Sequence, residues 1–123
     1  MERIRKNEEF QKIYNSKSQK LFSYYSIMYI KKNNYDYNRL GVVVSKKNGN
    51  AVVRNRIKRL LREFFRKNEK NFSKENSFDI IVISKKHFGE KAFEIKYEEI
   101  EKDLRVTLKK GGYVVWETFL FFW

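Results

Sequence analysis

The sequence predicts a single small α+β domain, in which helices pack on one compact sheet. The length of 123 residues suits one hydrophobic core, and 41% of the residues are hydrophobic, which is enough to fill it. Apolar residues recur with the helical period in some segments and with the strand period in others, in the order αββαβα. No internal repeat or long linker divides the sequence, so we expect one domain.

The first helix is predicted over residues 7–15, where Phe10, Ile13 and Tyr14 recur at the spacing of one helix face. A strand is predicted over 24–31, because this segment is rich in aromatic and β-branched residues.

A polar loop over 33–38 separates this strand from a second one, predicted over 40–45. Residues 46–50 form a predicted turn, in which Gly49 can adopt a positive φ and the following asparagine can cap a helix. That second helix is predicted over 51–67, and it is the segment whose periodicity is clearest.

After a polar loop, residues 78–84 are almost continuously apolar, which is typical of a strand buried on both faces. A lysine-rich turn follows, and the last helix is predicted over 94–110. The domain is therefore predicted over 1–110. Residues 111–123 form an aromatic extension that is too short to cross a bilayer, and its role stays open at this point.

Charge is the unusual feature of the composition. The formal net charge is +13 and the pI is near 9.9, so a polyanion is the expected partner, with nucleic acid preferred over a membrane surface. The sequence has no cysteine, which excludes disulfides and cysteine-based zinc sites. Because the N-terminus lacks the apolar segment of a signal peptide, we expect a cytoplasmic protein.

The helix predicted over 51–67 separates its apolar residues from its cations. The apolar residues fall in an arc of about 120°, and polar and cationic residues fall in an arc that does not overlap it. No acidic residue occurs between Asp36 and Glu63, so the repulsion between the cations is unrelieved. A merely solvated basic helix is the alternative, but such a face usually mixes signs. The pattern favours binding to phosphates.

The sequence contains no recognisable catalytic motif. We expect no catalytic residue and no metal site, because no nucleophile–base pair and no set of metal ligands occurs at suitable spacing. His87 is expected to be exposed in the lysine-rich turn. The acidic residues of the last helix have lysines and arginines nearby and predict a solvated face.

One family matches these motifs. The segments Gly49-Asn50-Ala51-Val52, Arg54-Asn55-Arg56 and Lys58-Arg59, together with Arg62, resemble the pattern of the bacterial ribonuclease P protein. The resemblance extends from about residue 3 to residue 110 and includes the opening helix and two of the predicted strands.

The resemblance implies a subunit of a holoenzyme, an endoribonuclease that removes the 5′ leader of precursor tRNA. In that family the catalytic RNA carries the chemistry with divalent cations such as Mg²⁺, and the protein alone holds no cofactor. The resemblance also implies a left-handed βαβ crossover, as in the second domain of ribosomal protein S5. The residues expected to contact RNA are Lys46, Lys47, Arg54, Asn55, Arg56, Lys58, Arg59 and Arg62.

For the single-stranded leader, the resemblance implies a cleft that contains Phe10, Tyr14 and Tyr29. Aromatic rings in a basic groove stack on bases largely without reading sequence, which suits leaders of varied sequence. These residues also suit a hydrophobic core, and for Phe10 the two interpretations stay open.

Two other functions remain to be separated from this one. A ribosomal-type structural RNA-binding protein shares the basic helix but does not depend on a leader. A helix-based transcription factor is disfavoured, and DNA is not expected as a partner, because strands flank the basic helix here.

Overall fold

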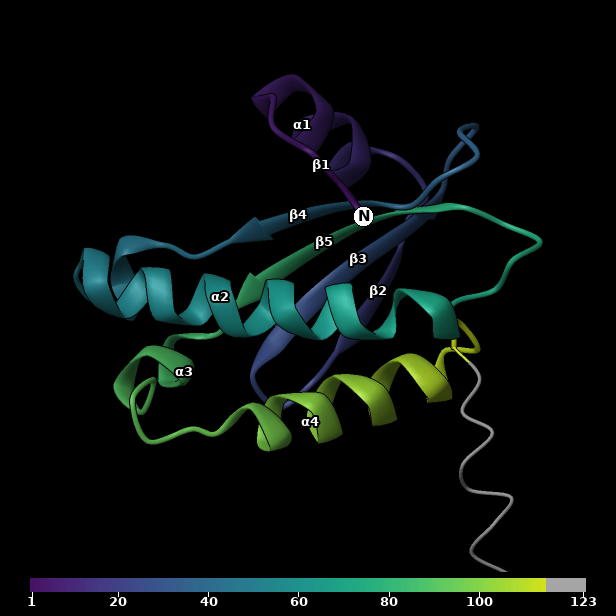
Figure 1. The fold of residues 1–123 in the computed structure, drawn as a ribbon. Helices are drawn as coiled ribbons and strands as arrows, with labels where there is room; N and C mark the ends of the chain where they lie inside the picture. Colours follow the sequence, from purple (N-terminus) through teal and green to yellow (C-terminus); the bar gives the residue numbers. More distant parts are fainter. Residues whose placement is uncertain (115–123) are drawn as a thin grey trace, which may run out of the picture.

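A mixed five-stranded sheet forms the centre of the molecule, in the strand order β1-β4-β5-β3-β2 (Figure 1). The computed structural model describes residues 1–114, and residues 115–123, most of the predicted aromatic extension, lie outside the described part. The strands are β1 (Glu2–Arg3), β2 (Gln19–Phe22), β3 (Ser26–Lys32), β4 (Arg39–Val43) and β5 (Phe78–Ser84). The central strand β5 is parallel to β4 and antiparallel to β3.

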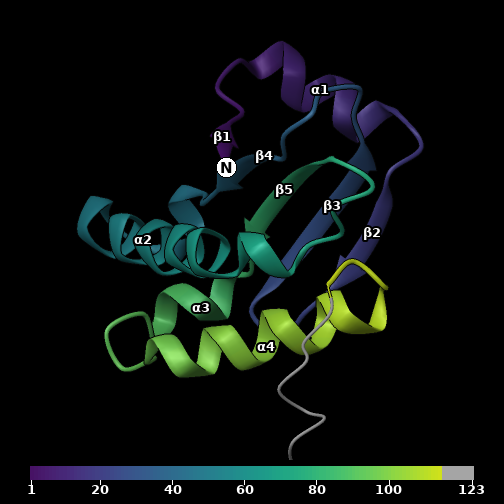
Figure 2. The same cartoon turned by 45° about the vertical axis from the view of Figure 1, so that its right-hand side comes forward.

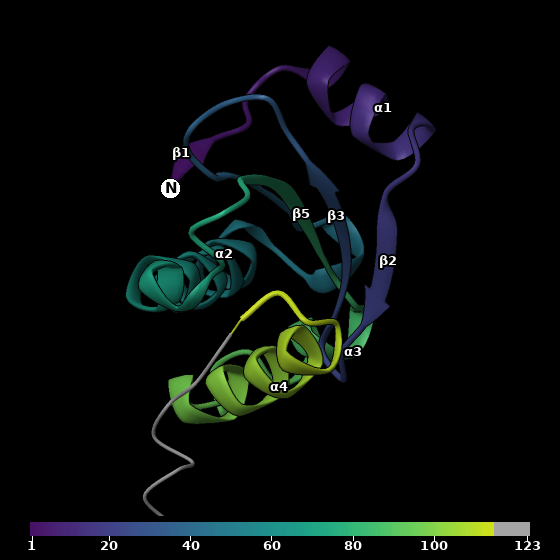
Figure 3. The same ribbon diagram turned by 90° about the vertical axis from the view of Figure 1, so that its right-hand side faces the viewer.

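Helices cover both faces of the sheet. They are α1 (Asn7–Asn15), α2 (Ala51–Asn68), α3 (Lys86–Glu90) and α4 (Tyr97–Lys110), with short 3₁₀ turns η1 (Lys46–Asn48) and η2 (Glu69–Asn71) before and after α2. The helices α2, α3 and α4 lie together on one face (Figure 2). Of the helices in residues 1–114, only α1 lies on the other face (Figure 3).

Two apolar cores explain why β5 is apolar almost throughout. Ile80 and Val82 point into the larger core, which α2 and α4 close with residues such as Phe64. Ile81 points the other way and packs with Ile13 of α1. Successive residues of a strand face opposite sides, so a strand covered on both sides needs apolar residues at every position. The prediction for 78–84 is confirmed.

The connection from β4 through α2 to β5 is left-handed, as the resemblance implied. In Figure 1 the parallel strands β4 and β5 point the same way, and α2, which follows β4 and precedes β5 in the chain, crosses in front of the sheet. General chain sterics favour the opposite hand. The α+β class and the single compact sheet are also confirmed.

Three elements escaped the prediction. β1 has two residues and β2 is a largely exposed edge strand, so neither shows a clear apolar period. α3 is five residues long and has one buried side chain, Phe88. The expectation that His87 is exposed was wrong: its ring is half-buried, with centroids 4.8 and 5.6 Å from those of Tyr24 and Tyr25. Among the residues that the structure describes, no helix is long and apolar enough to cross a membrane.

Candidate nucleic-acid interface

The start of α2 is fixed by contacts within the preceding turn and with α3. The Asn50 side chain caps the helix by accepting a hydrogen bond from the Val53 N–H at 3.0 Å. Gly49 has φ of 135°, a conformation that favours glycine. Gly89 of α3 lies directly against the turn, because a Cβ there would come within 1.9 Å of the Asn48 carbonyl oxygen. The orientation of α2 is therefore set at its first turn.

The sequence prediction of a two-sided helix is confirmed by the burial of α2. Its buried side chains include Ile57, Leu61 and Phe64, which pack on the sheet and α4. On the outer side, Asn55 and Arg59 are exposed, and Arg54, Lys58 and Arg62 are partly exposed. Lys46 and Lys47 are exposed in the turn before the helix. Packing thus holds the cations on a rigid support.

A hollow of about 630 Å³ lies over this cationic face. It brings together four of the predicted RNA-contacting residues with three that were not predicted. The predicted ones are Asn55, Lys58, Arg59 and Arg62. The others are Arg3, Glu63 and Arg66. Arg3 reaches the site because β1 pairs with β4, and no periodicity in two residues could have indicated this.

Electrostatic repulsion is concentrated at Arg62. Partial burial lowers the pKa of its guanidinium, and the charges of Arg3 and Arg5 lower it further. The group stays charged at neutral pH, but its charge is less favourable here than in water. An anion placed among these three arginines would relieve the repulsion, so the arrangement suits a phosphate.

Arg56 differs from the other members of the predicted set. Its Nε donates to the Ala92 carbonyl at 3.2 Å and its Nη2 donates to the Ile95 carbonyl at 3.1 Å. Both acceptors lie between α3 and α4, so this guanidinium ties α2 to the loop that joins them. By contrast, Arg54 makes a local bond, from Nε to the Gly49 carbonyl at 3.2 Å.

The three cleft residues come together between α1 and the sheet. The rings of Tyr14 and Tyr29 meet edge to face, with centroids 5.1 Å apart. Phe10 approaches β4 so closely that a Cβ on Gly41 would lie 2.5 Å from its ring. All three rings are half-buried. They therefore pack on the smaller core and also keep surface exposed, so the two interpretations of Phe10 do not exclude each other.

One lysine lies beside the Tyr29 ring of this group. The ammonium group of Lys20 lies 5.4 Å from the centroid of the Tyr29 ring and 5.2 Å from that of Phe22. Burial raises the pKa of Tyr14, and the neighbouring Tyr29 adds to this, so the Tyr14 phenol stays a neutral donor near neutral pH. Across residues 1–114, no group of three or more histidine, cysteine or acidic side chains could hold a metal ion.

Comparisons with known proteins agree on one family. The model of the ribonuclease P family matches residues 1–111. The ribonuclease P protein component of Fusobacterium nucleatum is 46% identical over 111 residues, which cover 90% of this chain and 97% of that protein. The corresponding protein of Clostridium kluyveri is 43% identical over 111 residues, with 89% and 94% coverage.

Solved structures give the same result. The ribonuclease P protein of Thermotoga maritima superposes with a TM-score of 0.78 at 34% identity and covers 89% of this chain and 97% of its own. That of Staphylococcus aureus gives 0.77 at 35% identity, with 94% and 99% coverage. Together with the basic helix and its fold context, these matches show that the chain belongs to the family of ribonuclease P protein components.

Proposed function

We propose that this chain binds the catalytic RNA of ribonuclease P through the cationic face of α2, and the 5′ leader of precursor tRNA through the cleft beside α1. The single observation that carries the proposal is the hollow of about 630 Å³, in which Arg3, Arg62 and Arg66 gather with Lys58 and Arg59. Cations fixed by packing lose little freedom when they meet phosphates.

In this proposal the catalytic RNA, rather than this chain, carries out the hydrolysis that removes the leader. The chain offers cations and aromatic rings at both places, and the proposal needs no catalytic group or metal from it. Hydrolysis then depends on divalent cations such as Mg²⁺ held by the RNA. The protein contributes by neutralising phosphate repulsion, which raises substrate affinity and lowers the requirement for Mg²⁺.

Salt dependence tests the cationic face. Binding to a bacterial ribonuclease P RNA is measured over a series of salt concentrations for the wild type, Arg54→Ala and Arg62→Ala. Each variant is expected to make the slope of log K against log salt less negative by about one. Lys102→Ala is the matched control, because Lys102 is exposed on α4, and it should leave the slope unchanged. Unchanged slopes for both arginine variants would contradict the assignment.

Leader dependence separates this function from that of a ribosomal-type structural RNA-binding protein. Complexes of the chain with the catalytic RNA are tested for binding to precursor and mature tRNA. Tyr29→Ala should weaken binding of the precursor by about fivefold or more and leave mature tRNA unaffected. Equal binding of both tRNAs by the wild-type complex would favour the structural protein instead.

A further inference from the structure

Two tyrosines in the loop between β3 and β4 form an exposed aromatic surface outside the cleft. The rings of Tyr35 and Tyr37 are stacked, with centroids 5.1 Å apart and planes inclined by 22°. They keep 49% and 42% of their surface exposed. Single exposed aromatic residues are common, but a stacked exposed pair presents a broad π surface to a ligand. We call this pair the tyrosine platform.

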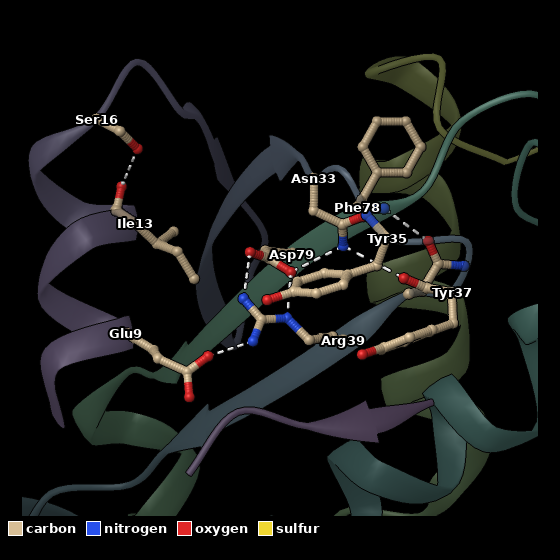
Figure 4. A network of polar contacts seen from close by, with 10 residues as sticks. Glu9, Ile13, Ser16, Asn33, Tyr35, Tyr37, Arg39, Phe78 and Asp79 are labelled. Carbon is tan, nitrogen blue, oxygen red and sulfur yellow. Dashed lines mark hydrogen bonds and ion pairs between the residues drawn. The ribbon is translucent and has the colours of Figure 1, made fainter. Parts of the chain in front are cut away.

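The platform is held in place by a polar network (Figure 4). Asn33 Oδ1 accepts from the Tyr35 N–H at 3.0 Å, and Asn33 Nδ2 donates to the Tyr37 carbonyl at 3.3 Å and to Asp79 at 2.9 Å. The guanidinium carbon of Arg39 lies 4.7 Å from the centroid of the Tyr35 ring. A surface that is already ordered loses little entropy when it binds a ligand.

Arg39 also connects the platform with the cleft. Its Nη1 contacts the carboxylate of Glu9 on α1, and the next residue of that helix is Phe10. Figure 4 shows Glu9 and Tyr35 both beside the Arg39 guanidinium. The Arg39 guanidinium thus contacts both the helix that carries Phe10 and the ring of Tyr35, so the platform lies beside the start of α1.

Cations for the phosphates of such a strand lie beside the platform. A hollow of about 310 Å³ is lined by Tyr37 together with Lys70, Lys74 and polar side chains. Two acidic residues, Asp36 and Glu69, also line it. The carboxylate of Glu69 is bound by the N-terminal ammonium group at 3.1 Å, which leaves the two lysines in excess over Asp36.

We infer that the tyrosine platform stacks unpaired bases of the precursor leader upstream of those held in the cleft. This inference rests on the proposed function, because it extends the leader path of the same complex. Stacking on aromatic rings tolerates any base, and flanking lysines serve the backbone, so the surface suits a single strand of variable sequence.

Leader length provides the test. The full chain is assembled with a bacterial ribonuclease P RNA, and affinities are measured for precursor tRNAs whose leaders grow by one nucleotide at a time. The double variant Tyr35→Ala/Tyr37→Ala should bind short leaders as the wild type does and lose about fivefold or more in affinity for the longest. The variant Tyr35→Phe/Tyr37→Phe keeps both rings and should behave as the wild type.

Tyr24→Ala is the matched control, because Tyr24 is 67% exposed and precedes the other end of β3; it should have no effect at any length. The inference is overturned if the double alanine variant binds long leaders as tightly as the wild type, or if it loses affinity equally for all lengths. The proposed function fails separately, if the wild-type complex itself shows no dependence on the leader.

Discussion

Replacing Arg39 with methionine removes the centre of a buried ion network that joins α1, β4 and β5. Arg39 Nε and Nη2 donate to the two carboxylate oxygens of Asp79 at 2.8 and 2.7 Å, and Nη1 contacts Glu9. The side chains of Arg39 and Asp79 are only 13% and 8% exposed. The bond to Asp79 is the largest cause of the raised pKa of Arg39, which burial opposes, so the group is charged at every pH at which the protein is studied.

The expected loss follows from what the substitution leaves behind. An exposed ion pair contributes about 0–1 kcal/mol, whereas a buried carboxylate deprived of its partner costs about 3–5 kcal/mol. Asn33 still donates to Asp79 at 2.9 Å, which relieves part of this cost. We therefore expect Arg39→Met to lower the free energy of unfolding by about 3 kcal/mol.

Urea unfolding followed by far-UV circular dichroism measures the loss. The double variant Arg39→Met/Asp79→Asn should recover more than half of it, because a neutral amide costs less to bury than a carboxylate. Glu9→Gln should cost less than about 1 kcal/mol, since the Glu9 side chain is 31% exposed. A loss below about 1 kcal/mol for Arg39→Met, or no recovery in the double variant, would refute this reasoning.

Three further substitutions test other parts of the structure. The Arg56 guanidinium binds two carbonyls of the α3–α4 loop, so Arg56→Ala should lower the free energy of unfolding, as measured by urea unfolding. The same variant should change the salt dependence of RNA binding less than Arg62→Ala does, as measured by salt titration. Gly89→Ala should destabilise the fold by about 3 kcal/mol in the same unfolding assay, because its Cβ would meet a backbone carbonyl at 1.9 Å. Burial is the largest cause that raises the pKa of Tyr97 from its ordinary value near 10 to about 12, and nearby carboxylates add to the increase. The stability contributed by this shift is therefore complete below pH 10 and lost as the pH rises through 12, and Tyr97→Phe should remove that part of the pH dependence in urea unfolding.

The elements predicted from the sequence are those whose burial imposes a period. α2 buries one side only, so its apolar residues recur with the helical period, and β5 is buried on both sides, so it is apolar at almost every position. β2 was missed because its residues are mostly exposed, and β1 because two residues show no period. The left-handed crossover could be expected only from the family resemblance, since general chain sterics favour the opposite hand.

The candidate site was predictable to the extent that it lies on one element. The cations of α2 could be placed on one face by helical spacing, but spacing alone did not indicate that Arg56 turns toward the α3–α4 loop. Arg3 and Arg5 join Arg62 through the pairing of β1 with β4, which is a tertiary contact. The tyrosine platform likewise depends on Arg39 and its partners from distant segments.

The most direct test of the central claim is cleavage of a 5′-extended precursor tRNA by a bacterial ribonuclease P RNA at low Mg²⁺, with and without this chain. We predict cleavage at the mature 5′ end that depends on the protein and weakens in Arg62→Ala. An absence of stimulation by folded protein, across several catalytic RNAs and salt concentrations, would contradict the account.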